Sequence, residues 1–193
     1  MKNYIYLLTI VLMVFIVSCD DLKEKIEVGF RTNIEAEIPV KTQNTMAIDL
    51  KSVQVANDVY SFIGGGGFSL TDIPELKKYI NNMRSIVAEE GSVVKITGAV
   101  DGNKILSLKM KFGMQITPGT EPPMITAFSY TGELLANAGE ISYLNDAWAP
   151  LLIGALSANR DKVFIISVEG TSNYSINSIA KVKIPVKVTA SPL

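Results

Sequence analysis

The side chain best suited to chemistry is the thiol of Cys19, the single cysteine of the chain. It follows Ser18, a small residue, and an apolar run from residue 5 to residue 17 that only Thr9 interrupts. A basic start (Lys2), a short apolar stretch and a small residue are typical of a secretory signal. The run is shorter than the roughly 20 residues of a membrane-spanning helix. The sequence therefore predicts a signal peptide over residues 1–18, followed by a nucleophilic thiol.

The four residues Ile16, Val17, Ser18 and Cys19 resemble the lipobox of bacterial lipoproteins. The resemblance implies that the Cys19 thiol receives a diacylglycerol, that the leader is cut before it and that the new amine is acylated. Two or more acyl chains hold a protein stably at a membrane, at about 0.8 kcal/mol per buried methylene. The alternative is an ordinary signal peptide followed by a free cysteine.

An acidic pair, Asp20 and Asp21, follows directly. In Bacteroidetes-type lipoproteins, which the pair resembles, acidic residues here favour export to the cell surface. In other Gram-negative bacteria an Asp after the cysteine favours retention at the inner membrane, and a plain solvated tether is the third interpretation. Extended, residues 20–25 span at most about 20 Å. We expect an outer-membrane lipoprotein, facing the cell surface or the periplasm, whose folded part stays near the bilayer.

The remaining composition excludes several kinds of chemistry. The chain has no histidine, so a Ser-His-Asp triad, a Cys-His dyad and His-ligated zinc are ruled out. Removal of the leader takes away one positive charge, and the net charge changes from −1 to −2. This balance argues against nucleic-acid binding, which needs a basic surface. The acidic pairs Glu35/Glu37 and Glu89/Glu90 are typical of solvated positions, so we expect no metal site and no cofactor. A His-independent hydrolase, with Ser and Lys or two carboxylates brought together by the fold, stays open.

Alternating hydrophobicity runs through most of the chain and predicts a mainly β fold. We expect an antiparallel β-sandwich or open barrel with one or two packed helices, forming a single domain over residues 26–193 behind a tether at 19–25. The expected strands cover residues 26–40, 46–55, 92–100, 104–112, 124–130, 163–168 and 181–188.

Local patterns add four finer predictions. Asp72, Pro74 and the apolar spacing up to residue 87 predict an amphipathic helix. Residues 64–67, four glycines, predict a flexible connector. The strands within residues 92–112 are expected to form a hairpin about Asp101-Gly102-Asn103. Pro39 and Pro185 lie inside strands and predict that both strands are sheet edges, because proline cannot donate to a ladder.

Residues 145–158 contain the only tryptophan and almost no charge. Asn145 or Asp146 could cap a helix with Pro150 in its first turn. Such a helix is apolar nearly all round, so it packs in the core, lines a pocket for an apolar ligand, or contacts the bilayer or a protein partner. The residues we single out for such a contact are Trp148, Leu151 and Leu152. The sequence thus favours an anchored lipoprotein with a binding or structural role. A carrier of a lipid or other apolar ligand is the alternative.

Overall fold

The computed structural model describes residues 27–43, 59–117 and 119–192. The lipobox, Cys19, Asp20-Asp21 and the expected strand over residues 46–55 lie outside the described residues.

The fold is mainly β and antiparallel, as predicted, with the strands of the described ranges paired in the order β6-β5-β8-β2-β1-β9-β4-β7. A further strand, β3, pairs with β9 beyond the end of β4, so β3 and β4 follow one another along the same neighbour. The strands are β1 (Val28–Thr42), β2 (Tyr60–Phe68), β3 (Met83–Ala88), β4 (Val93–Thr97), β5 (Lys104–Met114), β6 (Ile125–Leu135), β7 (Glu140–Leu144), β8 (Phe164–Ser172) and β9 (Asn177–Ala190).

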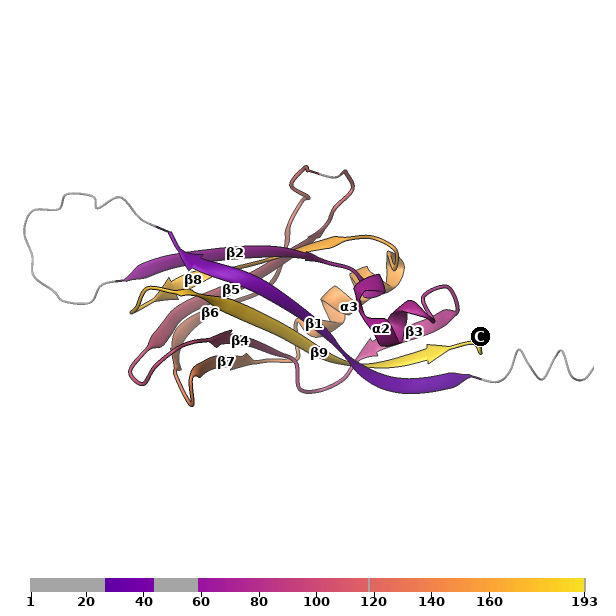
Figure 1. Cartoon of the computed structure of the whole chain (residues 1–193), viewed down its shortest axis with the longest axis horizontal. Helices are drawn as coiled ribbons and strands as arrows, with labels where there is room; N and C mark the ends of the chain where they lie inside the picture. Colours follow the sequence, from indigo (N-terminus) through magenta and orange to yellow (C-terminus); the bar gives the residue numbers. More distant parts are fainter. Residues whose placement is uncertain (1–26, 44–58, 118, 193) are drawn as a thin grey trace, which may run out of the picture.

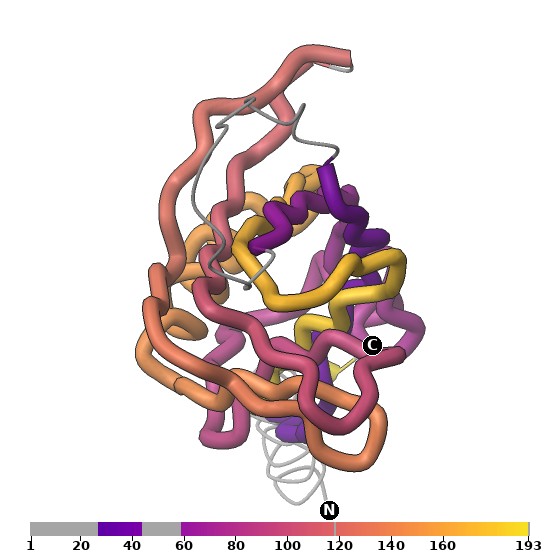
Figure 2. Tube along the Cα trace, turned by 90° about the vertical axis from the view of Figure 1, so that its left-hand side faces the viewer, coloured from indigo at the N-terminus to yellow at the C-terminus, as the bar shows by residue number. Residues whose placement is uncertain are grey.

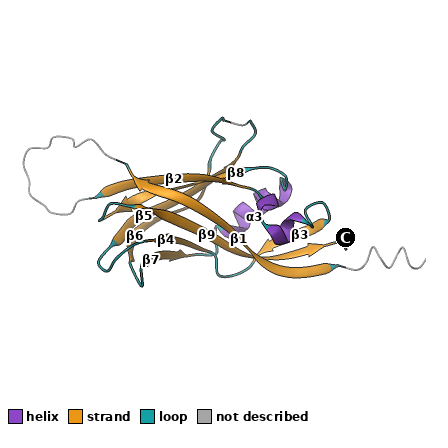
Figure 3. Cartoon of the chain, viewed as in Figure 1, coloured by secondary structure: helices purple, strands orange, loops and turns teal. Residues whose placement is uncertain are grey.

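The sheet curls until its two edge strands, β6 and β7, approach one another, which gives a nearly closed barrel around one hydrophobic core (Figures 1 and 2). Strands make up most of the described residues, and the helices lie near the end of the sheet where the C-terminus emerges (Figure 3). The long loop between β5 and β6 stands out from the body in both orientations.

The longest pairing joins β1 and β9 and confirms the alternation predicted for both segments. Register runs from Val28 opposite Ala190 to Lys41 opposite Asn177. The inward residues Ile34, Ile38, Ile184 and Val186 are buried, and the lysines of β9 lie on the opposite face. Residues 163–168 are apolar on both faces, which predicts a central strand, and β8 does lie between β5 and β2.

The helix predicted from Asp72 to residue 87 is wrong. Only a 3₁₀ turn, η1 (Leu70–Asp72), and one helical turn, α2 (Pro74–Lys77), form before strand β3 begins. Asp72 does make a capping box, but with Ser69 at the start of η1. The helix-like spacing of Met83 and Ile86 comes from a bulge, because the pairing with β9 shifts register between Met83 and Ser85. One extra residue leaves two buried side chains three positions apart, as in a helix.

The four glycines at 64–67 form the second half of β2, so the predicted connector is also wrong. A Cβ atom on Gly64 would lie 2.1 Å from the carbonyl oxygen of Pro39. Glycine is therefore needed here because β1 passes close to β2, a recognised use of glycine inside strands.

Both strands of the hairpin expected within residues 92–112 form, but the prediction that they pair with each other is wrong. The turn forms, with Gly102 at φ +88° and the Asn103 amide donating to the Val100 carbonyl. However, β4 pairs with β7 and β9, whereas β5 pairs with β6 and β8. The turn therefore carries the chain between two separate parts of the curled sheet.

Pro39 and Pro185 lie in interior strands, so the prediction of two edges is wrong. The Pro185 carbonyl accepts from the Glu89 amide, and the N and C=O of a strand residue point to the same side. The missing N–H of Pro185 therefore faces the junction where β3 ends and β4 has not yet begun. Likewise, the pairing between β1 and β2 starts at Val40, directly after Pro39. Both prolines occupy gaps in the ladder rather than edges of the sheet.

The second predicted helix forms as α3 (Ala149–Ala158), with Pro150 in its first turn. Trp148 is its N-cap residue, and neither Asn145 nor Asp146 fills that position. The helix packs against β3 and β6. Across the described ranges, none of the helices has the length and apolar character needed to cross a membrane.

Candidate functional site

A row of hydroxyl side chains crosses four neighbouring strands on the outer face of the sheet. Ser61 of β2 lies opposite Thr171 of β8, Thr171 opposite Ser107 of β5, and Ser107 opposite Thr131 of β6. The Ser107 and Thr171 hydroxyl oxygens are 2.8 Å apart and share a hydrogen bond. Adjacent strands are about 4.8 Å apart, so this hydroxyl row is about 14 Å long.

A charged row lies beside the hydroxyl row on the same four strands. Ile63 of β2, Glu169 of β8, Lys109 of β5 and Ser129 of β6 are aligned by the same pairings. Glu169 lies 2.8 Å from the Lys111 amine and 3.5 Å from the Lys109 amine. The hydrogen bond from Lys111 is the main reason that the pKa of the Glu169 carboxyl is below its ordinary value, and Coulombic attraction to both lysines adds to it.

Together the two rows form a shallow cleft of about 340 Å³, which also includes Gln43. We name this hollow the polar cleft after its outward side chains, which are Gln43, Ser61, Ile63, Ser107, Lys109, Ser129, Thr131, Glu169 and Thr171. Phe62, Leu108, Tyr130 and Gly170, which lie between these positions on the same strands, also line it. Its volume falls at the lower end of the range found for small-molecule sites. Short hydroxyl side chains bordered by longer charged ones give it depth, and Ile63, with 41% of its surface exposed, supplies an apolar patch.

The backbone beneath the polar cleft is fixed by a close contact. A Cβ atom on Gly170 would lie 2.1 Å from the Ser107 carbonyl oxygen and 2.7 Å from the Phe62 ring. The Phe62 ring, 2% exposed, fills this position on the inner side of the sheet. Strands β5 and β8 are therefore held close together at the point where Ser107 meets Thr171.

Chemically, this arrangement offers hydrogen bonds of both kinds. Hydroxyls donate and accept, the Glu169 carboxylate accepts, the Lys109 amine donates, and the Gln43 amide does both. The cleft does bring a serine and a lysine onto one face, the pattern a Ser-Lys hydrolase needs. However, Ser107 is paired with Thr171 and Lys109 with Glu169. The geometry suits the binding of a polar ligand better than the activation of a nucleophile.

The residues singled out from the sequence, Trp148, Leu151 and Leu152, lie on the other side of the sheet. Trp148 and Leu152 are buried in the core, at 2% and 0% exposure, whereas Leu151 is 49% exposed at the surface. Trp148 meets Phe128 of β6 at a centroid distance of 5.9 Å, and Phe128 stacks on Tyr143 of β7 at 4.7 Å. These aromatic side chains fill the seam between β6 and β7.

A second group of charged side chains lies on the outer face of β1, β9, β4 and β7. Glu37 pairs with Lys181 at 3.0 Å, and Lys95 pairs with Glu140 at 2.8 Å. The hydrogen bond to Glu37 is the first cause of the raised pKa of the Lys181 amine. A hollow of about 300 Å³ lies among these charges. These four charges face partners of opposite sign across the strands, as expected of a structural ion-pair array.

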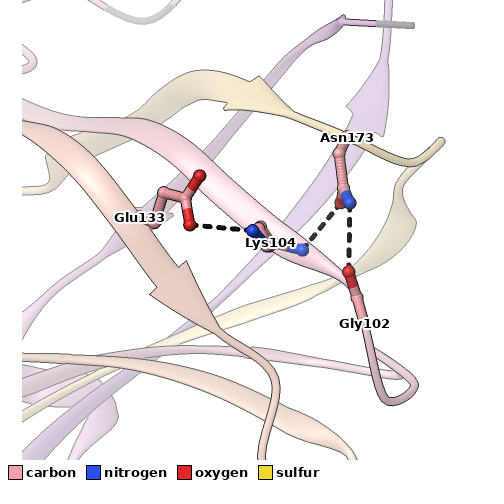
Figure 4. Close-up of polar contacts among 4 residues, drawn as sticks. All are labelled: Gly102, Lys104, Glu133 and Asn173. Carbon is pink, nitrogen blue, oxygen red and sulfur yellow. Dashed lines mark hydrogen bonds and ion pairs between the residues drawn. The ribbon is translucent and has the colours of Figure 1, made fainter. Parts of the chain in front are cut away.

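Two polar side chains, each through hydrogen bonds to backbone groups, link separate loops at the ends of the strands. The Asn173 side chain accepts from the Lys104 amide at 2.7 Å and donates to the Gly102 carbonyl at 3.0 Å (Figure 4). It thus joins the turn after β8 to the turn before β5. Asp146, which does not cap α3, accepts from the amides of Ser92 and Gly91 at 2.6 and 2.9 Å. The Ser92 amide is the main reason that the pKa of the Asp146 carboxyl is lowered.

Comparison with known proteins leaves the chain without a named family. No family model matches it, and no curated protein matches it. Among solved structures, a chain titled Desmodium yellow mottle tymovirus aligns with 86% of this chain and 90% of its own length. The two share 8% sequence identity, with a TM-score of 0.35. At this level the likeness carries no argument about function.

The outward position of some side chains in and beside the polar cleft could be predicted from the sequence. The alternation of apolar residues in 104–112 predicts that Lys109 and Lys111 lie outward, away from Leu108 and Met110, and the structure has them on the outer face. The neighbours of Lys109 and Lys111 across the strands could not be deduced, because the order of β2, β8, β5 and β6 does not follow the sequence.

Proposed function

We propose that this chain is a membrane-anchored lipoprotein with a binding role, and that the polar cleft is its ligand-binding surface. The anchor is Cys19, through its acyl chains, as the lipobox resemblance implies. The observation that carries the binding role is the polar cleft itself, where two aligned rows present hydroxyl, carboxylate and amine groups to solvent. With the tether of residues 20–25, a ligand would be met close to the membrane.

The anchor has a direct test. The full chain is expressed in a Gram-negative host, and the purified protein is digested and analysed by mass spectrometry. The proposal predicts an N-terminal peptide that starts at acylated Cys19. An unmodified Cys19 after leader cleavage would contradict it. The variant Cys19→Ser serves as the control and should yield no acylated peptide.

The binding role is tested on the mature chain, residues 19–193, carrying Cys19→Ser so that it stays unacylated. Amide NMR spectra are recorded with maltotriose, inorganic phosphate, diglycine and palmitate. We expect at least one of the three polar ligands to shift amide signals of β2, β5 and β8 around Glu169. Shifts confined to Trp148, Phe128 and Tyr143 on addition of palmitate would contradict the proposal.

Palmitate binding beside Trp148 would indicate the second candidate function, which is that of a carrier of an apolar ligand. It is favoured by one observation: among the described residues, the indole N–H of buried Trp148 has no hydrogen-bond partner. Buried polar groups are rarely left unpaired, so an acceptor atom of a ligand would suit this position. Trp148 also lies at the seam where β6 and β7 do not pair. Lipid co-purifying with the mature chain would support this function.

A further inference from the structure

The polar cleft has a geometry that restricts the chemistry of its ligand. Resting on the proposed binding role, we infer that the polar cleft binds an uncharged polyhydroxylated chain, a neutral oligosaccharide, lying across strands β2, β8, β5 and β6. Three features of the cleft favour such a ligand: its repeat of hydroxyl groups, its charges of both signs and its apolar patch.

The repeat comes from the sheet. Ser61, Thr171, Ser107 and Thr131 stand on successive strands, so their hydroxyls recur at the strand spacing of about 4.8 Å. A row about 14 Å long matches an extended ligand that carries hydroxyl groups along its whole length. Each serine or threonine hydroxyl can donate one hydrogen bond and accept two, which matches a ligand whose own hydroxyls do the same.

The mixed charge disfavours a free ion, because an ion of either sign meets a like charge beside the one carboxylate and two amines. The Glu169 carboxylate lies at the centre of the charged row and would repel an anion. The Lys109 and Lys111 amines lie 3.5 and 2.8 Å from it and would repel a cation. A neutral hydroxyl can instead donate to the carboxylate, and such charge-assisted bonds are stronger than bonds between neutral groups.

The apolar patch is Ile63, which follows Ser61 on the same outer face of β2 and lies opposite Glu169. Its side chain is 41% exposed, and the other outward side chains of the polar cleft are polar or charged. A sugar ring presents a C–H face as well as its hydroxyl edge, so it can cover Ile63 while its hydroxyls reach Glu169 and Thr171. A fully polar ligand such as phosphate gains nothing from this contact.

The inference is tested by calorimetric titration of the mature Cys19→Ser chain with four neutral trisaccharides: maltotriose, cellotriose, xylotriose and N-acetylchitotriose. Inorganic phosphate is titrated in parallel. We expect at least one trisaccharide to bind and phosphate not to bind. The variant Thr171→Val should weaken that trisaccharide about tenfold, the effect of losing a paired hydroxyl, and Glu169→Gln should weaken it as well.

The matched control is Thr97→Val. Thr97 and Ser178 form a second hydroxyl pair between strands, 3.2 Å apart, on β4 and β9 outside the polar cleft. This variant should bind the trisaccharide as the parent does, and circular dichroism should show all three variants folded.

Each other outcome overturns the inference in a recognisable way. Trisaccharide affinity that is unchanged in both Thr171→Val and Glu169→Gln would place the sugar elsewhere. Phosphate binding that Lys111→Gln abolishes, with no trisaccharide bound, would keep the binding role and exclude the neutral ligand. If neither a trisaccharide nor phosphate binds, the inference is overturned, and a palmitate-induced shift of the Trp148 signals would show that the binding role at the polar cleft fails as well.

Discussion

The Glu169 carboxylate on β8 lies 2.8 Å from the Lys111 amine on β5, and this ion pair places a compensated charge in the middle of the outer face. Lys109 approaches the same carboxylate from the next outward position of β5. The ion pairs join β5 and β8, the two strands that carry Ser107 and Thr171. The charged row and the hydroxyl row therefore depend on the same pair of strands.

The first prediction concerns pH. The pKa of Glu169 is lowered in the folded chain, so its ion pair stabilises the fold above the ordinary value of 4.5 and is lost as pH falls through the lower folded value. Urea unfolding at several pH values should show Glu169→Gln less stable than the parent at pH 7, by about 0.5 kcal/mol for a partly exposed pair. The difference should shrink at pH values below the ordinary pKa of 4.5. A difference that grows on acidification would refute the assignment.

The second prediction concerns the close approach of β1 and β2. Gly64→Ala would place a methyl group 2.1 Å from the Pro39 carbonyl, so the strands must separate. We expect a loss of about 1–3 kcal/mol in the free energy of unfolding, typical of overpacking. The control is Gly154→Ala in α3, where nothing lies within 4 Å of the added carbon. That variant should be stabilised by up to about 1 kcal/mol, because alanine favours a helix.

The third prediction separates the two leucines of α3. Leu152 is fully buried, and Leu152→Ala should cost about 2–5 kcal/mol through lost contacts and a cavity. Leu151 is half exposed, so Leu151→Ala should lower the free energy of unfolding by well under about 1 kcal/mol, as is usual for surface sites. Thermal and urea unfolding measure both. Equal losses would mean that α3 does not sit on the core as described.

The fourth prediction concerns the brace at Asn173. Asn173→Ala removes two hydrogen bonds between separate turns, and we expect a loss of about 1–2 kcal/mol. Hydrogen exchange should show faster exchange of the Lys104 amide, which donates to Asn173. Glu133→Gln, which disturbs only the exposed ion pair with Lys104, should change stability by less than about 0.5 kcal/mol. An unchanged Lys104 exchange rate would contradict the brace.

The mainly β class and most of the strands could be predicted because alternation records which face of a strand is buried. Three of the wrong local predictions have one physical cause, which is that the residues of a strand do not determine which other strands it pairs with. The bulge beside Met83 imitates a helical period, Gly64 serves a neighbouring strand, and Pro185 sits at a gap between β3 and β4. Each feature makes sense only once the strand order is known.

The same limit applies to the candidate site. Lys109 could be placed on the outer face from β5 alone. However, Ser61 and Thr171 belong to distant segments, and only the register of β2, β8 and β5 places them in one row. Trp148 is conspicuous in the sequence because it is the only tryptophan and lies among apolar residues. The fold assigns its ring to the core beside Phe128.

Whether the polar cleft binds a neutral sugar is decided by a crystal structure of the mature chain with the tightest-binding neutral trisaccharide. We expect a sugar ring over Ile63, with hydroxyls within hydrogen-bonding distance of Glu169 and Thr171. A sugar bound away from these residues, or an empty polar cleft in a crystal that holds palmitate beside Trp148 between β6 and β7, would contradict the proposed binding surface.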